Sequence, residues 1–486
     1  MKIRKSGSFA LVCALPAASL IAGCSSGGLP APQRGASSPA QLFDCRVPAP
    51  RSALPIVLSR VMAAACKTSG ARASSTAVQM NQTRPAAGEV VLYRFRGRRD
   101  GALPGDGLIA DASGALYGTT VYGGTHDDGT VYKLTPRGSG YAESVLYSFK
   151  GGRDGANPGG RLIANLNGTL YGTTTLGGDI ACANVLGKGC GTVFALAQLG
   201  SRYMKRTLYT FKGYPSDGTQ PDTLVADASG ALYGSTSFGG DSGKCSTEGP
   251  GCGVVFRLSE SGTSYQENVL HNFDGGHDGL NPTDGLLIDN TGALYGTTFF
   301  GGRTGNGTVY RLLPSKRGYA ERVLYSFKGA RDGYGPNGSL ILGRTGALYG
   351  TTLNGGTGCG NDGCGTAFAL RPSGSAYIET VLYSFQGGDD AAFPTGGLLA
   401  SRNGALDGNS GDGGSMYCAH AGCGTVFELT PSGSSYTDRV LYAFKGGRND
   451  GQIPLGTLLR MQSRLYGATG YGGVRESGTA FSVMRH

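Results

Sequence analysis

A short motif recurs seven times along this chain and constrains its fold more than any other feature. Leu-Tyr-x-Phe, or a close variant, recurs about every 58 residues and ends at Phe95, Phe149, Phe211, Phe273, Phe327, Phe385 and Phe444. A period of this length is typical of repeated supersecondary units, each of which buries its apolar face against its neighbours. Although 486 residues would by length alone make two or three domains, the repeat favours a single array.

Each repeat contains four short runs with the pattern of β-strands. In the first repeat these are the apolar pair Leu108–Ile109 (A), Leu116–Gly118 (B), Gly129–Leu134 (C) and the Leu-Tyr-x-Phe run (D). The runs alternate between apolar and polar residues and are separated by turns rich in glycine, of which the chain has 88. Four-stranded units repeated around an axis are the blades of a β-propeller.

The two ends of the repeat region complement each other. It begins with an unpaired D strand, Val90–Phe95, and ends with an A-B-C set over residues 457–483. Pairing them completes the seventh blade and leaves no open edge. We therefore predict an all-β fold over residues 90–486, a seven-bladed β-propeller of four-stranded antiparallel blades, closed by the N-terminal strand joining the last blade.

The repeats resemble those of the Gloeo/Verruco (GloVer) tandem-repeat family. Leu348–Thr352 and Val323–Phe327 carry its Leu-Tyr-Gly-Thr-Thr and Leu-Tyr-Ser-Phe signatures, and the likeness covers about 390 residues. Blade six departs most, with Asp407 in place of the tyrosine. The resemblance implies a surface protein and carries no known chemistry.

The first 23 residues are typical of a lipoprotein signal peptide. A basic start is followed by the apolar run Phe9–Ala22. The end of this run overlaps Ile21–Cys24, which resembles a lipobox with lipid on Cys24. An ordinary secretory signal cut elsewhere is the alternative. We expect export and anchoring to the cell envelope, and Ser25 favours the outer membrane by resemblance to enteric-type lipoproteins.

Residues 24–89 are rich in Ala, Ser and Pro and predict a tether. Within it, Leu54–Cys66 has helical apolar spacing, and a bridge between Cys45 and Cys66 would close a small cap; a frayed apolar patch is the alternative. The net charge of +10 falls to +7 once residues 1–23 are removed, so we expect no nucleic-acid partner, and membrane contact only through the lipid.

Loop lengths point to one face of the ring. The B–C connection varies strongly among repeats, whereas the other three are almost constant. In an antiparallel blade the B–C and D–A connections emerge on the same side, and variable loops on a rigid scaffold are common binding sites. We predict that this B–C/D–A face binds a partner; loops drifting without selection are the alternative.

Eight cysteines fall in pairs within the four longest B–C connections. In an exported chain this pattern predicts the disulfides Cys182–Cys190, Cys245–Cys252, Cys359–Cys364 and Cys418–Cys423. A zinc site would need four ligands, and only His420 lies within a pair, so no metal is expected.

Each D–A connection carries an aspartate at a recurring position. These candidate binding-face residues are Asp100, Asp154, Asp217, Asp278, Asp332, Asp390 and Asp450. We favour a turn in which each carboxylate accepts bonds from nearby backbone amides; a ring that binds Ca²⁺ or a basic partner is the alternative.

No catalytic constellation is evident. The five histidines share no repeat position, and neither a nucleophile elbow nor a metalloprotease helix motif occurs. We therefore expect a binding module for a protein or glycan, with no cofactor. Two alternatives remain: a carbohydrate-active enzyme drawing on Asp407, Asp412 or Asp127–Asp128, and a scaffold for outer-membrane assembly.

Overall fold

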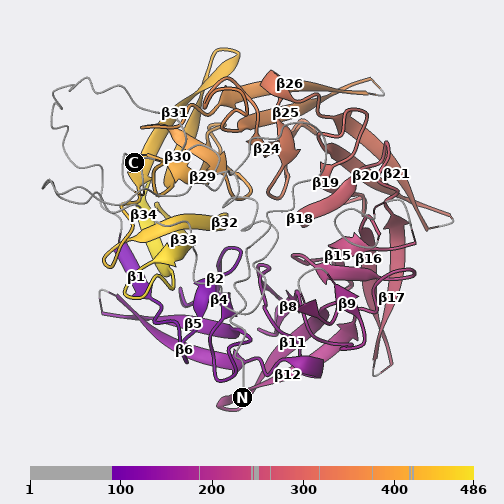
Figure 1. Ribbon diagram of the computed structural model, residues 1–486, viewed down its shortest axis with the longest axis vertical. Helices are drawn as coiled ribbons and strands as arrows, with labels where there is room; N and C mark the ends of the chain where they lie inside the picture. Colours follow the sequence, from indigo (N-terminus) through magenta and orange to yellow (C-terminus); the bar gives the residue numbers. More distant parts are fainter. Residues whose placement is uncertain are drawn as a thin grey trace, which may run out of the picture. The chain divides into compact units, whose positions relative to one another are not determined.

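The computed structural model describes residues 90–485 except 139, 185–186, 242–244, 246–250, 263, 317, 375, 415–417 and 419–420. The predicted signal peptide and tether, with Cys24, Cys45 and Cys66, lie outside this part of the chain. The described residues form a ring of seven four-stranded antiparallel blades (Figure 1). The predicted fold class is confirmed.

Blades 1 to 4 follow one another along the chain. Blade 1 contains β2 (Ala102–Pro104), β3 (Ile109–Ala110), β4 (Leu116–Tyr122), β5 (Thr130–Arg137) and β6 (Gly140–Ser148). Blade 2 contains β7 (Ile163–Ala164), β8 (Leu170–Thr174), β11 (Thr192–Leu199) and β12 (Arg202–Thr210), and β9 (Ala183–Asn184) pairs with β10 (Gly187–Lys188) in its loop. Blade 3 contains β13 (Gly218–Pro221), β14 (Val225–Ala226), β15 (Leu232–Gly239), β16 (Val254–Ser261) and β17 (Ser264–Asn272). Blade 4 contains β18 (Leu280–Ile288), β19 (Leu294–Phe300), β20 (Thr308–Ser315) and β21 (Gly318–Ser326).

Blades 5 to 7 complete the ring. Blade 5 contains β22 (Tyr334–Pro336), β23 (Ile341–Leu342), β24 (Leu348–Asn354), β25 (Thr366–Ser373) and β26 (Ala376–Ser384). Blade 6 contains β27 (Ala391–Pro394), β28 (Leu399–Ala400), β29 (Leu406–Gly413), β30 (Thr425–Ser432) and β31 (Ser435–Ala443). Blade 7 contains β32 (Gly451–Met461), β33 (Arg464–Gly472), β34 (Thr479–Met484) and β1 (Val90–Arg94).

The ring closes as predicted. β1 lies antiparallel to β34, with Val90 opposite Ser482 and Arg94 opposite Thr479. The first described strand thus supplies the outer strand of blade 7, and β34 is paired on both sides instead of forming an open edge.

The innermost strand is longer than the sequence pattern indicates. In blade 1 it begins at Ala102, opposite Tyr122, and is interrupted before Ile109 resumes pairing with Tyr117. In blade 4 the same strand is continuous, with a register shift between Thr283 and Leu287. Proline and glycine in this stretch hide the alternation expected of a strand, because proline lacks an amide donor and glycine favours a bulge.

Aromatic pairs join each blade to the next. The phenylalanine that ends each D run packs edge-to-face or tilted on a ring in strand C of the following blade, as Phe149 does on Phe194 at 5.2 Å between ring centroids. The same contact occurs at all seven interfaces, including Phe95–Tyr132 and Phe444–Phe481. Such pairs contribute about 1 kcal/mol each beyond the area they bury.

The described helical segments are two single turns of 3-10 helix, η1 (Gly152–Asp154) and η2 (Ala330–Asp332). Within the described part of the chain, no helix has the length and apolar character needed to cross a membrane.

Candidate functional site

The B–C loops and D–A turns form one connected layer on one face of the ring. In every blade, the second glycine after strand B donates its N–H to a carbonyl of the D–A turn that enters the blade, as Gly124 does to Arg98 at 2.6 Å. Gly124 has φ +82°, and a side chain there would collide with Ser148. The backbone thus fixes the B–C loops against the turns that carry the predicted aspartates.

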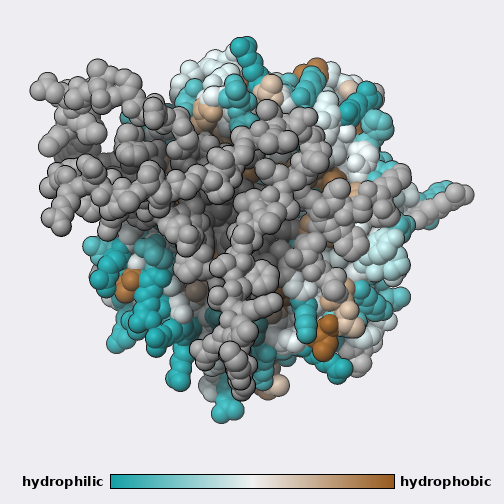
Figure 2. Space-filling view, viewed as in Figure 1, coloured by the Kyte–Doolittle hydropathy of each residue, from teal (hydrophilic) through white to brown (hydrophobic). Residues whose placement is uncertain are grey.

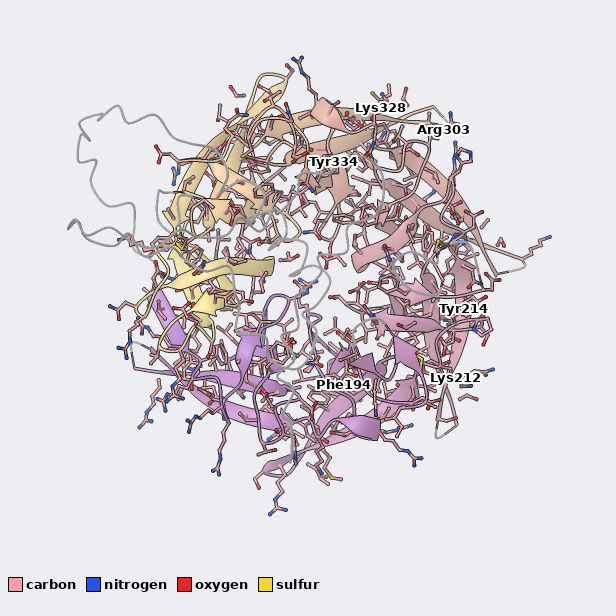
Figure 3. The ribbon with its side chains drawn as sticks, in the orientation of Figure 1. Phe194, Lys212, Tyr214, Arg303, Lys328 and Tyr334 are labelled. Carbon is pink, nitrogen blue, oxygen red and sulfur yellow. A yellow bond between two sulfur atoms is a disulfide. The ribbon has the colours of Figure 1, made fainter. Side chains whose placement is uncertain are left out.

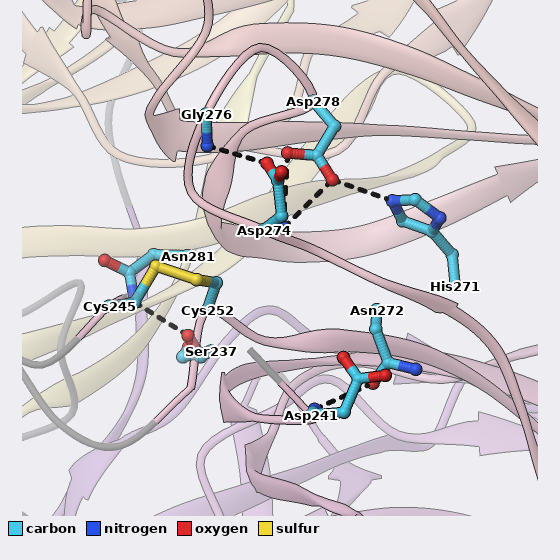
Figure 4. The surroundings of a disulfide bond; sticks show 10 residues. All are labelled: Ser237, Asp241, Cys245, Cys252, His271, Asn272, Asp274, Gly276, Asp278 and Asn281. Carbon is cyan, nitrogen blue, oxygen red and sulfur yellow. Dashed lines mark hydrogen bonds and ion pairs between the residues drawn. A yellow bond between two sulfur atoms is a disulfide. The ribbon is translucent and has the colours of Figure 1, made fainter. Parts of the chain in front are cut away.

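Four disulfides clamp this layer, and the predicted pairs Cys182–Cys190, Cys245–Cys252, Cys359–Cys364 and Cys418–Cys423 are confirmed. Each packs on a glycine of the D–A turn that leaves its blade; at Gly213 an added Cβ would lie 2.7 Å from Cys182 Sγ. Figure 4 shows the second bridge beside Asn281, whose Nδ2 donates to the carbonyl of Ser237 at 2.7 Å. Disulfides of this kind are typical of oxidising, extracytoplasmic compartments.

The seven D–A aspartates each serve the turn that carries them. Asp100, for example, accepts bonds from the Tyr93 hydroxyl at 2.8 Å and from the Arg96 amide at 3.0 Å. Asp154, Asp217, Asp332, Asp390 and Asp450 repeat this tyrosine-and-amide pattern, and at Asp278 a histidine, His271, replaces the tyrosine (Figure 4). Among the described residues, no three acidic, histidine or cysteine side chains converge as a metal site would require.

A second carboxylate, which the sequence analysis missed, lies near the turn aspartate at five blade interfaces. Burial and then the neighbouring aspartate raise the pKa of Glu143, Glu267 and Glu321 to about 7, and of Glu379 and Asp438 to about 8. For Glu321 burial is the main cause, because His271 lowers the pKa by more than Asp278 raises it. One oxygen of each side chain is buried without a hydrogen-bond partner.

Blade 2 replaces this second acid with a lysine. Lys205 Nζ lies 3.0 Å from Asp154 Oδ1 and 2.9 Å from Thr207 Oγ1, and only 3% of its side chain is exposed. The position recurs six residues before the D-strand phenylalanine, so a repeat-by-repeat alignment of charged residues could have found it.

The carboxylates considered for an enzyme do not form a common site. Asp407 is fully buried and ion-paired with Arg460 and Arg485. Asp127 Oδ1 accepts the Gly123 amide at 2.9 Å. Asp412, in β29, is 4% exposed, and burial raises its pKa to about 7.

An axial pocket brings together residues that the sequence analysis did not single out. Its volume is about 90 Å³, and the inner strands of blades 1, 2, 3, 4, 6 and 7 line it. Leu103, Val121 and Leu455 provide apolar walls. Because β2 and β32 start directly after D–A turns and β4 leads into a B–C loop, these walls lie toward the B–C/D–A face. Asp106, Asp222 and Asp284 make the lining acidic.

Asp106 and Asp284 form an interacting pair in this pocket. Burial, followed by the charge of Asp106, raises the pKa of Asp284 to about 7, so the two carboxyls lie close enough to interact. Asp106 accepts bonds from Thr223 Oγ1 at 3.1 Å and from the Thr457 amide at 3.2 Å. Asp284 accepts the Gly285 amide at 2.9 Å. Below about pH 7 the two carboxylates can therefore share one proton while keeping their other hydrogen bonds.

The backbone at Asp284 is strained. Its φ is +62°, whereas the equivalent residues of blades 5 and 7 are Gly338 and Gly456, which adopt positive φ without a side-chain penalty. A left-handed conformation costs a non-glycine residue about 1 kcal/mol, and aspartate is one of the residues that tolerate it. The sequence signal was therefore present: two residues after the inner-strand proline, four blades have glycine but blades 1 and 4 have aspartate.

Comparison with known proteins gives a family match along most of the chain. The model of the Gloeobacter/Verrucomicrobia repeat matches residues 62–249 and 243–481. A comparison with curated protein sequences finds no match.

Solved structures of similar fold have little sequence in common with this chain. A gluconolactonase from Xanthomonas campestris is 15% identical, with 82% of this chain and 98% of that chain covered and a TM-score of 0.36. A protein of unknown function from Dyadobacter fermentans is 12% identical (83% and 99% covered, TM-score 0.43), and a PL25 polysaccharide lyase, an ulvan lyase, is 10% identical (82% and 96% covered, TM-score 0.45). At these values the likenesses say nothing about what this chain binds or catalyses.

Proposed function

Because the chain belongs to the Gloeobacter/Verrucomicrobia repeat family and builds a closed propeller, we propose that it is a binding module whose axial pocket receives the end of a glycan. The observation that carries this proposal is the Asp106–Asp284 pair, of which one member occupies a strained position that other blades give to glycine. Strain at a polar residue in a pocket is typical of functional sites.

The chemistry of the pocket suits a polyhydroxylated ligand. A carboxylate pair that shares a proton offers both a donor and acceptors, and sugar hydroxyls need both. Leu103, Val121 and Leu455 can pack against the apolar face of a sugar ring. A volume of about 90 Å³ is too small to enclose a polymer, so a glycan would enter by its end.

Hydrolysis of glycosides is less well supported. The two carboxyls of a glycosidase stand about 5 Å or more apart, since the scissile bond lies between them. Asp106 and Asp284 interact with each other directly, which favours a shared proton over a scissile bond held between them. The observation that still favours an enzyme is the pKa of Asp284 near 7, a suitable value for general acid–base catalysis.

The predicted anchor belongs to this proposal. Lipid on Cys24 and a tether over residues 24–89 would hold the propeller at the cell envelope, and the disulfides are consistent with that compartment. The outer membrane remains the proposed location.

A glycan-binding screen of the full chain and its pocket variants tests the proposal. We expect Asp106→Leu to abolish binding, and Asp284→Asn to keep binding at pH 6, because the amide resembles the protonated acid. Binding by the parent should weaken above pH 7, when both carboxyls ionise and repel, and Asp284→Asn should lack this loss.

Asp389→Asn, an exposed acid in a D–A turn, is the matched control and should bind as the parent does. Unchanged binding by Asp106→Leu, with a native thermal melt, would refute the pocket. If the parent turns over a glycan and Asp284→Asn abolishes this turnover, the protein is a carbohydrate-active enzyme and not a binding module.

A further inference from the structure

Four consecutive D–A turns present a row of positive charges on the B–C/D–A face. These turns comprise residues 445–450, 96–100, 150–154 and 212–217, and they join blades 6, 7, 1, 2 and 3 in ring order. Together they contain eight lysines and arginines, all exposed. We call this row the cationic arc.

The turn geometry leaves these cations without ion-pair contacts, although Arg96 and Lys212 act on nearby carboxyls through their charge. The four acids of the same turns, Asp100, Asp154, Asp217 and Asp450, are directed to tyrosine hydroxyls and backbone amides. Within the described residues, no ion pair joins a cation of the arc to a carboxylate. Of the other three turns, those at 274–278 and 386–390 contain no lysine or arginine and carry the exposed acids Asp274 and Asp389, whereas the turn at 328–332 adds two further exposed cations, Lys328 and Arg331.

The arc adjoins the axial pocket. The turn at 96–100 leads directly into β2, whose Leu103 and Pro104 line the pocket. At the end of the arc next to blade 3, Tyr214 is 44% exposed and shares a turn with Lys212 (Figure 3). An exposed aromatic ring beside a cation can stack on a sugar while the cation binds an acidic substituent.

We propose that the cationic arc binds an anionic polysaccharide, a polymer of uronate or sulfated sugars, whose end enters the axial pocket. This rests on the proposed function, because it names the class of glycan. The arc and the pocket would bind different parts of the ligand. The cations bind the acidic groups along the polysaccharide, and the acidic pocket accepts only hydroxyls at the end of the polysaccharide.

Other polyanions fit less well. Nucleic acid is scarce in the oxidising compartment that the four disulfides indicate. A lipid surface would need an apolar patch beside the charges to bury acyl chains, whereas Tyr214 is the only exposed large hydrophobic residue of the four turns. On the face seen in Figure 2, hydrophobic residues also appear singly among hydrophilic ones along the described rim.

Titration calorimetry with two polymers tests the inference. The full chain should bind alginate, a polyuronate, and this binding should weaken between about 50 and 300 mM NaCl, because salt screens exposed charges. The triple variant Arg99→Gln/Arg153→Gln/Arg448→Gln, with one change in each of three turns, should lose about tenfold or more in affinity at low salt.

A matched variant carries the same charge change on the opposite face. Arg137→Gln/Arg202→Gln/Arg402→Gln alters exposed arginines of C–D and A–B turns and should lose less than about twofold. Equal losses of alginate affinity in the two triple variants would overturn the proposed role of the arc, and so would equal affinity of the parent for alginate and neutral dextran. Neither result would contradict the glycan pocket. Binding to phosphatidylglycerol vesicles without binding to alginate would also overturn it. If no glycan binds at all, the proposed function itself fails.

Discussion

Asp412 is a buried acid without a partner. Its Oδ2 has no hydrogen-bond partner, and burial alone raises its pKa to about 7. The equivalent residues are apolar or aromatic in five of the other blades, such as Leu176 and Phe238, and Asn354 occupies the position in blade 5. A shift from the ordinary value of 3.8 to about 7 corresponds to roughly 4 kcal/mol when the group is ionised.

We expect Asp412→Leu to stabilise the propeller at pH 8 by a few kcal/mol and to change little at pH 4. A carboxyl whose folded pKa is raised costs nothing while it is protonated in both states, and its cost grows as pH rises from about 4 to 7. Urea unfolding at both pH values measures the effect, with Asp412→Asn as the polar control. A loss of stability at pH 8 would show that the carboxylate has a partner in solution.

At the level of the strands, the acid pairs between blades make stability depend on pH. Glu379 in β26 and Asp332 in the adjacent turn illustrate them, since burial and Asp332 raise the pKa of Glu379 to about 8. The folded state therefore binds protons that the unfolded chain releases above about pH 4.3. Stability from these groups is greatest below about pH 4.3 and falls as pH rises from there to about 7 to 8.

Two opposite substitutions test this pairing by thermal melts between pH 5 and 8.5. Glu379→Gln should raise the melting temperature at pH 8.5 by several degrees and leave it nearly unchanged at pH 5. Lys205→Glu should create a further acid pair with Asp154 and lower the melting temperature, more at pH 8.5 than at pH 5. A parent melting temperature that is constant over this range would contradict the acid pairs.

At the level of the whole ring, one blade interface differs from the other six. Elsewhere, a tyrosine of strand B interacts with a tyrosine of the next blade's D strand, as Tyr117 does with Tyr203. Between blades 6 and 7, Asp407 takes the place of the first tyrosine. Arg460 and Arg485 bind Asp407, and Arg485 also lies 2.6 Å from Glu428.

Arg485→Gln should destabilise the ring by about 2 kcal/mol or more, because it removes one of the cations that offset a buried carboxylate. Urea unfolding measures the change, and Arg402→Gln, an exposed turn arginine, should have almost no effect. A loss below about 0.5 kcal/mol would mean that Arg460 alone suffices for Asp407.

The sequence alone determined the architecture. Seven copies of the Leu-Tyr-x-Phe motif set the number of blades, complementary ends predicted the closure by Val90–Phe95, and pairs of cysteines a few residues apart predicted bridges within single loops. These features are local or periodic, so one chain displays them directly. The anchor at Cys24 and the bridge between Cys45 and Cys66 stay predictions, since they lie outside the described residues.

Only the tertiary structure decided which side chains meet. Asp106 and Asp284 belong to blades 1 and 4, yet both line the axial pocket and interact with each other. Each acid pair likewise joins two different blades. The D–A aspartates were visible in the sequence, but their directions were not, and those directions leave the neighbouring cations facing solvent. Contacts across a ring depend on its closure and curvature, which the pattern within a single repeat does not encode.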